Sequence, residues 1–234
     1  MEILISVIVP AYNEEKFIGS CLTNLINQDF NKKHYEIIVI DNASTDDTAK
    51  IAKKFKVNLI YEAKKGVNFA VIKGFLEARG EIIALTDADT EVPVDWLTKI
   101  YKAFKENPKT VMVCGRSILR PKIFLSCISE FFINCVAGFI MKISPSYNLS
   151  IRRDIYFSIG GINKNLEFNL DTDLCFRAKR KGKFVFLWEN PVITSSRHYE
   201  GIEGIKCCFK GIINTIGLRI TKKTFFRKMA DIRG

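Results

Sequence analysis

The sequence predicts an α/β fold in which a central, mostly parallel sheet is flanked by helices on both faces. Short segments rich in β-branched residues alternate with segments whose apolar residues recur at helical spacing. The short segments are apolar at consecutive positions, which indicates strands buried on both faces, as in parallel sheets. The 234 residues show no internal repeat and no low-complexity linker. We therefore expect a single domain with one substantial core.

The elements follow one another in a regular order through the first half. The predicted strands cover 3–9, 36–40, 57–61, 82–86 and 110–114. The predicted helices cover 14–27, 46–55, 68–78 and 96–106. Ser44, three residues before Asp47, resembles the start of a capping box for the second helix. This succession is typical of strand–helix–strand units, whose parallel strands end at one edge of the sheet.

Two segments of the second half are apolar in a different way. Residues 123–143 form an apolar stretch of about the length of a membrane span, but Glu130 and Asn134 in its middle are costly in lipid. A helix that covers the core or the substrate, a membrane-surface helix and a membrane span all remain open, in that order. Residues 201–234 form a basic amphipathic helical segment, which either packs against the domain or contacts a membrane.

The charge and the cysteines restrict the partners and the compartment. The net charge is +11, and residues 201–234 alone carry eight Lys or Arg against two acidic residues. Such a patch attracts nucleotides, anionic lipids or nucleic acid. No nucleic-acid-binding pattern accompanies it, so we do not expect nucleic acid as a partner. The seven cysteines include no Cys-x-x-Cys pair, and the start of the chain does not resemble a signal peptide. We expect reduced core thiols and a cytoplasmic protein.

Polar residues follow three of the predicted strands at the edge where these strands end. They are 10–14 after the first strand, Asp41 and Asn42 after the second, and 87–89 after the fourth. Ligands of open parallel sheets bind at this edge, and acidic groups that converge there repel one another unless a ligand or cation compensates. Neither G-x-G-x-x-G nor G-x-x-x-x-G-K-[ST] is present. A divalent cation held by carboxylates is another means of binding phosphates.

Asp87 and Asp89 are the first candidates for that cation. They lie two residues apart, so in extended backbone their side chains point to the same side. Hard oxygen ligands beside a diphosphate suit Mn²⁺ or Mg²⁺ rather than zinc. The alternative is a turn in which both carboxylates bond their own backbone. Their place directly after a buried strand favours the metal.

Three blocks of the sequence resemble family 2 glycosyltransferases with the GT-A fold. They are VIVPAYNEE at 7–15, EIIVIDNASTDDT at 36–48 and GEIIALTDAD at 80–89, in the order and spacing of that family. Looser similarity continues through 147–153, 160–162 and 171–177. The resemblance implies an enzyme that transfers a sugar from a UDP- or GDP-linked donor to an acceptor hydroxyl, with inversion at the anomeric carbon.

The resemblance also implies roles for single residues. Pro10, Ala11, Tyr12 and Glu14 border the nucleotide, Asp41 bonds the base, Asp87 lies near the ribose and Asp89 holds the metal. Lys65, before the third helix, and Arg197 can face the phosphates. Two alternatives stay open. His198 either completes the metal site or is an ordinary surface or core histidine, and Glu91 is either a further metal ligand or a solvated acid.

The proton of the acceptor hydroxyl needs a carboxylate base. In the family this base is the Asp of a Glu-Asp pair just before a helix, which implies Asp171, although Leu170 stands here in place of the Glu. Asp173 is the rival base, and its alternative role is to cap the helix. A second departure is Ala-Val-Ile at 70–72, where many relatives show Ala-Arg-Asn, so the donor sugar is not predicted.

The acceptor half is expected over 116–200, after a nucleotide-binding half over 1–115. The apolar stretch 123–143 beside the basic segment 201–234 suggests a lipid-linked acceptor, or a glycan, reached at the cytoplasmic face of a membrane. Two other functions compete with glycosyl transfer. One is nucleotidyl transfer, although the loop at 10–15 is acidic rather than basic. The other is a non-catalytic nucleotide-binding or membrane-docking module, which the missing Glu before Asp171 favours.

Overall fold

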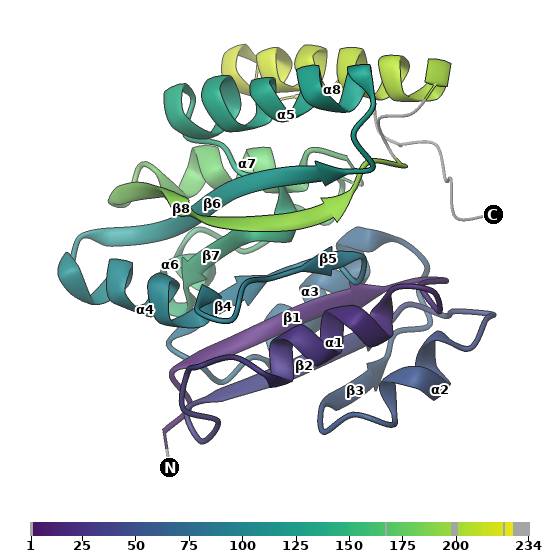
Figure 1. The fold of residues 1–234 in the computed structure, drawn as a ribbon. Coiled ribbons are helices and arrows are strands. Elements are labelled where there is room, and N and C mark those ends of the chain that lie inside the picture. The colour runs from purple at the N-terminus through teal and green to yellow at the C-terminus, as the bar shows by residue number, and fades with distance from the viewer. Residues whose placement is uncertain (1, 167, 198–200, 222, 227–234) are drawn as a thin grey trace.

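The computed structural model describes residues 2–166, 168–197, 201–221 and 223–226 (Figure 1). One eight-stranded sheet has the order β3-β2-β1-β4-β7-β6-β8-β5. Its strands are β1 (Ile5–Ala11), β2 (Tyr35–Asp41), β3 (Asn58–Tyr61), β4 (Ile82–Leu85), β5 (Thr90–Glu91), β6 (Thr110–Arg120), β7 (Leu149–Arg152) and β8 (Lys183–Ser195). The helical elements are α1 (Ile18–Ile26), α2 (Thr48–Ala52), α3 (Val67–Glu77), α4 (Trp96–Glu106), α5 (Phe124–Phe131), the π-helix η1 (Phe132–Ile140), the 3-10 turn η2 (Ser146–Asn148), α6 (Arg153–Ser158), α7 (Leu170–Ala178) and α8 (Gly201–Ile220).

The first half of the sheet is parallel and covered on both faces, as its uninterrupted apolar strands predict. β1 pairs in parallel with β2 and β4, and β2 pairs in parallel with β3. Side chains of β1 alternate between two core clusters. Val7 packs in the cluster that includes α1 and α4, whereas Ile8 packs in the cluster that includes α3 and α7. Burial on both faces explains why the strand lacks the alternation of a solvated sheet.

The second half of the sheet is mixed, while the sheet as a whole keeps more parallel than antiparallel pairs, as predicted. β7 is antiparallel to both β4 and β6, β8 is parallel to β6, and β5 is antiparallel to β8. β6 continues six residues past its predicted end at Cys114, across a register shift between Gly115 and Ser117. This extension carries the chain to the base of α5.

The first two helices are shorter than predicted because their starts are tied to each other. The amide of Glu14 donates to the Thr48 hydroxyl (2.7 Å), and the Glu14 carbonyl accepts from the amides of Phe17 and Ile18. Ser44 does not cap α2; its hydroxyl accepts from the Asn13 amide (3.1 Å), and Asp46 accepts from the Thr48 amide instead (3.0 Å). These bonds fix the loop that presents Glu14 at the end of β1.

Residues 124–140 form a helix, α5 continued by η1, whose inner face packs against β6 and whose outer face, with Phe124 and Ile140, is exposed. The two polar residues in its middle bind the end of β6. Asn134 exchanges two hydrogen bonds of 2.8 Å with the backbone of Ser117, and Glu130 accepts from the Leu119 amide (2.9 Å) and pairs with Lys122. Among the described residues, no helix is long and apolar enough to span a membrane.

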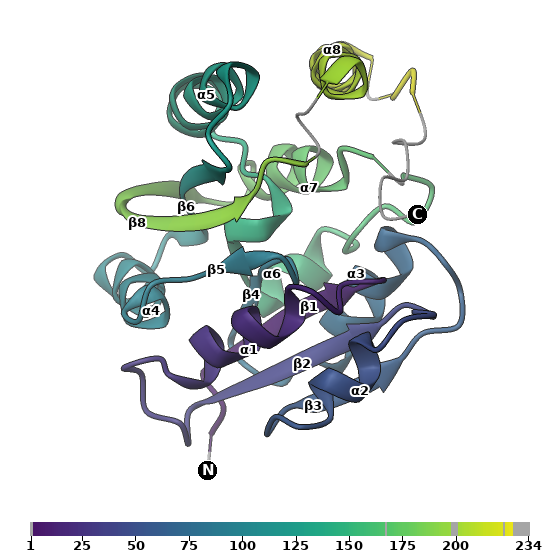
Figure 2. The ribbon, with the colours of Figure 1, turned by 45° about the vertical axis from the view of Figure 1, so that its right-hand side comes forward.

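Two amphipathic helices lie together at the end of the molecule opposite α2 and β3. Figure 1 shows α5 with α8 behind it, and in Figure 2 the two are seen nearly end-on, standing apart above α7. After α8 the chain folds back, because the amides of Phe225 and Phe226 donate to the buried Asn214 side chain (2.9 Å each).

The cysteines only partly match the expectation of core thiols. Cys21, Cys114 and Cys175 are buried, and all six cysteines whose side chains are described are free. Cys127 is exposed and Cys135 and Cys208 are half-buried. These three lie on α5, η1 and α8, whose outer faces do not pack in the core.

Candidate active site

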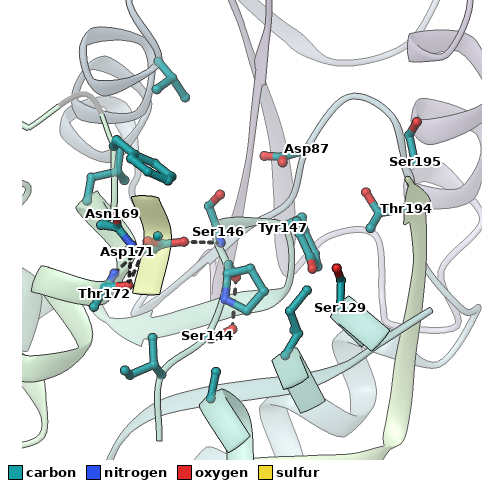
Figure 3. Close-up of a pocket in the computed structure, with 18 of the residues that line it drawn as sticks. Asp87, Ser129, Ser144, Ser146, Tyr147, Asn169, Asp171, Thr172, Thr194 and Ser195 are labelled. Carbon is teal, nitrogen blue, oxygen red and sulfur yellow. Dashed lines mark hydrogen bonds between the residues drawn. The ribbon is translucent and has the colours of Figure 1, made fainter. Parts of the chain in front are cut away.

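A cavity of about 930 Å³ lies where β1 and β4 end. Its lining comes from the ends of β1, β2, β4 and β8, the start of α3, the segment around η2, the start of α7, and the helices α5, η1 and α8. Figure 3 shows Asp171 at one side of this cavity and Thr194 and Ser195 at the other, with Ser146, Asp87 and Tyr147 between them. The fold thus brings the predicted donor residues and the predicted base around one space.

Carboxylates gather on the donor side of the cavity. Glu14, Asp87 and Asp89 all line it. Burial, together with the negative charges of Asp89, Asp87, Glu91 and Glu14 in that order, raises the pKa of the neighbouring Cys21 thiol. Convergence of acidic strand ends was predicted, and it holds for the first and fourth strands.

Arg197 is the cation that meets this cluster. Its guanidinium lies 2.9 Å from Asp89 Oδ2 and also pairs with Glu14 Oε1. The side chains of Glu14 and Asp89 are only 4% and 8% exposed. Burial lowers the pKa of Arg197, but the carboxylates of Glu14, Asp89 and Asp87 outweigh this effect and raise it. Arg197 therefore remains charged and joins residues that are far apart in the sequence.

Asp89 is also held by the edge strand. β5 pairs Thr90 with Thr194 of β8, and the two hydroxyls lie 2.8 Å apart. The Thr194 hydroxyl is 3.5 Å from Asp89 Oδ1. β5 has only two residues and no sequence pattern predicts it. Its pairing fixes the direction of the Asp89 carboxylate.

The donor set fits a divalent cation such as Mn²⁺ or Mg²⁺. Among the described side chains, no group of three or more His, Cys, Asp or Glu residues is arranged to hold a metal ion. Mg²⁺, however, is ordinarily held by one or two carboxylates together with substrate phosphates and water. Asp87 and Asp89 face the cavity with this chemistry, and the pairing of Asp89 with Arg197 shows that the position attracts positive charge. His198 lies outside the described residues.

The predicted nucleotide residues line the same side, with one exception. Pro10, Ala11 and Tyr12 border the cavity, and the Lys65 ammonium reaches the Tyr12 hydroxyl (3.3 Å). Asp41 does not line the cavity; it is buried and accepts a hydrogen bond from the Ser44 amide (3.3 Å). Its side chain closes the turn after β2, and its contact with the base stays a prediction.

Asn42, for which the sequence predicts no separate role, lines the cavity, whereas Asp41 does not. Its amide group donates to the carbonyls of Glu62 and Lys64 (3.1 and 2.8 Å), and its oxygen accepts from the Gly66 amide (2.8 Å). Asn42 thereby holds the loop that presents Lys65. Because the Gly66 amide is already bonded, it is not one of the groups that face a phosphate at the start of α3.

Asp171 lies in the first turn of α7 and lines the other side of the cavity. One carboxylate oxygen accepts from the Thr172 amide (2.7 Å) and the other from the Ser146 amide (3.0 Å). Burial raises the pKa of Asp171, and the two backbone hydrogen bonds oppose that rise without cancelling it. Asp173 does not line the cavity, since it forms an ion pair with Arg177 (2.6 Å).

Several lining residues had no sequence signal. Ser144, Ser146 and Tyr147 come from the segment around η2, and Asn169 has a left-handed backbone conformation (φ 58°) directly before α7. Leu170, which replaces the family's Glu, is buried in the core. Glu91 is exposed, accepts from the Ser20 hydroxyl (2.8 Å) and does not line the cavity.

The fold and the site together define an α/β protein of the GT-A type, with carboxylates at the ends of parallel strands. Residues 6–125 match the sequence model of glycosyl transferase family 2, a little over half of the chain. The chain belongs to this family.

The relatives are longer proteins. A dolichol-phosphate mannosyltransferase of Pyrococcus furiosus is 32% identical over 124 residues, which cover 51% of this chain and 35% of that protein. A dolichyl N-acetyl-alpha-D-glucosaminyl phosphate 3-beta-D-2,3-diacetamido-2,3-dideoxy-beta-D-glucuronosyltransferase of Methanococcus voltae is 32% identical over 47% of this chain and 38% of its own length. The match thus spans little more than a third of these curated relatives.

A solved structure extends the likeness to almost the whole chain. A mannosyltransferase from Pyrobaculum calidifontis, in complex with GDP-mannose and Mn²⁺, superposes with a TM-score of 0.75 at 21% identity. The superposition covers 96% of this chain and 66% of that one. At this identity the likeness shows the fold.

Proposed function

We propose that this protein transfers a sugar, with inversion, from a UDP- or GDP-linked donor to an acceptor hydroxyl. The observation that carries the proposal is the shared cavity, which Asp87, Asp89 and Asp171 all line. A single displacement needs the donor's anomeric carbon between a leaving diphosphate and an acceptor with its base. Residues 1–115 would hold the donor, and residues 116–200 would supply the acceptor side.

On the donor side, the first-half residues bind and orient the nucleotide. Tyr12 and Lys65 border its cavity, and Asp89 would hold Mn²⁺ or Mg²⁺ with Asp87 beside it. When bound, the cation supplies positive charge to the departing diphosphate. Arg197 adds a planar, permanently charged group at the same place. That the related mannosyltransferase was solved with GDP-mannose and Mn²⁺ supports this assignment.

On the acceptor side, Asp171 takes the proton of the attacking hydroxyl. The Ser146 and Thr172 amides hold both carboxylate oxygens, which fixes the direction of the side chain. A base pKa raised toward the working pH makes proton transfer in the transition state more effective. Asp173 lacks this access because it is committed to Arg177.

The acceptor that fits the surroundings is a lipid-linked molecule at the cytoplasmic face of a membrane. α8 carries a stripe of exposed isoleucines and phenylalanine at helical spacing, together with Lys206, Lys210 and Arg219. An apolar stripe with basic neighbours is typical of helices that lie in an anionic bilayer surface. The name of the Pyrococcus furiosus relative, which acts on dolichol phosphate, supports a lipid acceptor.

The donor proposal is tested by measuring the unfolding temperature with UDP-, GDP- and dTDP-sugars in Mn²⁺. Ligand that binds only the folded protein raises this temperature. We expect one donor to raise it in Mn²⁺ and to do so much less after chelation, and radiolabelled transfer from that donor completes the test. No shift with any donor would contradict the proposal, and a shift without turnover would leave a nucleotide-binding module.

The membrane proposal is tested by co-sedimentation with vesicles of phosphatidylcholine and phosphatidylglycerol. Ile205 and Phe209 are 58% and 65% exposed and do not line the cavity. Replacing both by Ser should lower the partition coefficient at least about tenfold, because each buried side chain contributes about 1.5–3 kcal/mol. Leu76→Ser, at an equally exposed leucine on α3, is the matched control and should not change binding. Equal partitioning of all three proteins would contradict membrane contact.

A further inference from the structure

The outer part of the cavity runs between the two amphipathic helices. Its lining there is apolar and includes Leu125, Ile128, Phe132 and Ile133 from α5 and η1, and Gly211, Ile212 and Ile216 from α8. In Figure 1 α5 lies in front of α8, and Figure 2 shows the two helices apart from each other above α7. We call this part of the cavity the interhelix slot.

The slot opens onto the apolar surface of the two helices. Four side chains that line the slot are also exposed to solvent. Their exposed fractions are 50% for Ile128, 52% for Ile216, 38% for Phe132 and 40% for Ile212. The cavity is open to the outside and not enclosed, and these exposed side chains border it on α5, η1 and α8. The opening therefore borders α8, whose apolar stripe we propose to contact the membrane.

The inner end of the slot is polar and reaches the proposed reaction centre. Ser129, Ser144 and Ser146 line it on the way to Asp171. The lining thus changes from apolar side chains at the mouth to hydroxyls and a carboxylate at the base. A molecule that matches it has a hydrocarbon part outside and a hydroxyl-bearing end inside.

We propose that the interhelix slot binds the hydrocarbon chain of the acceptor lipid, which enters sideways from the bilayer and places its reactive end at Asp171. This inference rests on the proposed transfer and names the site for the acceptor's tail. Continuity with the reaction centre, an opening on the apolar face and basic residues along α8 all favour a membrane lipid over a second protein chain.

The slot is tested by calorimetric binding of glucose and of hexyl, octyl and decyl β-glucosides below their micelle concentrations. The affinity of an alkyl glucoside rises with every methylene group that leaves water, by up to about tenfold for every two methylenes. We expect this increase in the wild-type protein. A slot already filled by a second copy or by another part of the chain would give no such series, and that result would overturn the proposal.

Gly211→Phe is the variant that fills the slot. A Cβ at Gly211 meets only Phe168, at 3.6 Å, so the backbone tolerates a side chain there. The phenyl ring should remove most of the gain from octyl to decyl glucoside, and Gly211→Ala should remove less. Undiminished gains in the phenylalanine variant would overturn the proposal.

Ser129→Cys provides a reversible closure that does not depend on a bulky residue. The Ser129 hydroxyl lies 3.6 Å from the Cys208 thiol, so the contact joins α5 to α8 across the slot. Oxidation should crosslink the variant and weaken decyl glucoside binding at least about tenfold, and reduction should restore it, with the oxidised wild-type protein as control. Equal binding in the crosslinked and reduced forms would contradict the slot.

Donor binding separates this inference from the proposed function. The donor-induced rise in unfolding temperature should persist in the Gly211→Phe and crosslinked proteins, because neither change touches the donor side. A flat chain-length series with intact donor binding would contradict the slot alone. A steep series without donor binding would support the slot and contradict glycosyl transfer.

Discussion

Asp171→Asn is expected to reduce kcat for sugar transfer by about 10²–10⁴-fold, the range found when a general base is removed. The asparagine keeps the size of the side chain but cannot accept the proton of the acceptor hydroxyl. Initial rates with a radiolabelled donor measure the effect. Donor binding should remain, because the Asp171 carboxylate bonds the Ser146 and Thr172 amides and not the residues proposed to hold the donor.

The matched control is Asp173→Asn, two residues further along α7. It breaks the ion pair with Arg177 and should cost stability, while transfer continues near the wild-type rate. In the native protein both carboxylate oxygens of Asp171 accept hydrogen bonds from backbone amides. In Asp171→Asn the side-chain NH₂ group therefore faces one of these N–H donors. The unfolding temperatures of both variants should be measured together with the rates. Near-wild-type transfer by Asp171→Asn would refute its role as the base.

The pH dependence gives an independent signature of the same base. Asp171 acts in its deprotonated form, and burial raises its pKa above the ordinary 3.8. The rate should therefore fall with decreasing pH at a higher pH than an ordinary aspartate would give. This acid limb of kcat/KM should be absent from the residual activity of Asp171→Asn.

Asp89→Asn is expected to lower transfer by at least about 10²-fold and to weaken Mn²⁺ binding in the presence of nucleoside diphosphate. Removing one of two carboxylates takes away a principal protein ligand of a hard cation. Electron paramagnetic resonance of free Mn²⁺ measures binding directly, apart from activity. Glu91→Gln is the control, because Glu91 is exposed and does not line the cavity.

Arg197 allows a second test of the metal site, in which the expected change in Mn²⁺ binding has the opposite sign. Its guanidinium pairs with Asp89 and Glu14, so it competes with any metal ion for these carboxylates. Arg197→Gln should bind Mn²⁺ more tightly than wild type without nucleotide, and should bind the nucleoside diphosphate more weakly. If Asp89→Asn left Mn²⁺ binding unchanged, the metal assignment would be wrong.

Much of the donor side follows from local sequence. The strands are recognisable because each is a short apolar run, and α4 has the predicted bounds because its apolar residues recur at helical spacing. The acidic groups at 14 and 87–89 were placed at the strand ends for the same reason. Periodicity and strand order are properties of neighbouring residues, so the sequence alone determines them.

The tertiary structure decided what depends on residues far apart in the chain. The pairing of Arg197 with Glu14 and Asp89 and the antiparallel β7 depend on long-range contacts that no short pattern encodes. Only the tertiary structure shows that Asp171 borders the cavity and that Asp173 does not. The slot between α5 and α8 likewise exists only because two amphipathic segments, each ambiguous in sequence, come to lie side by side above the reaction centre.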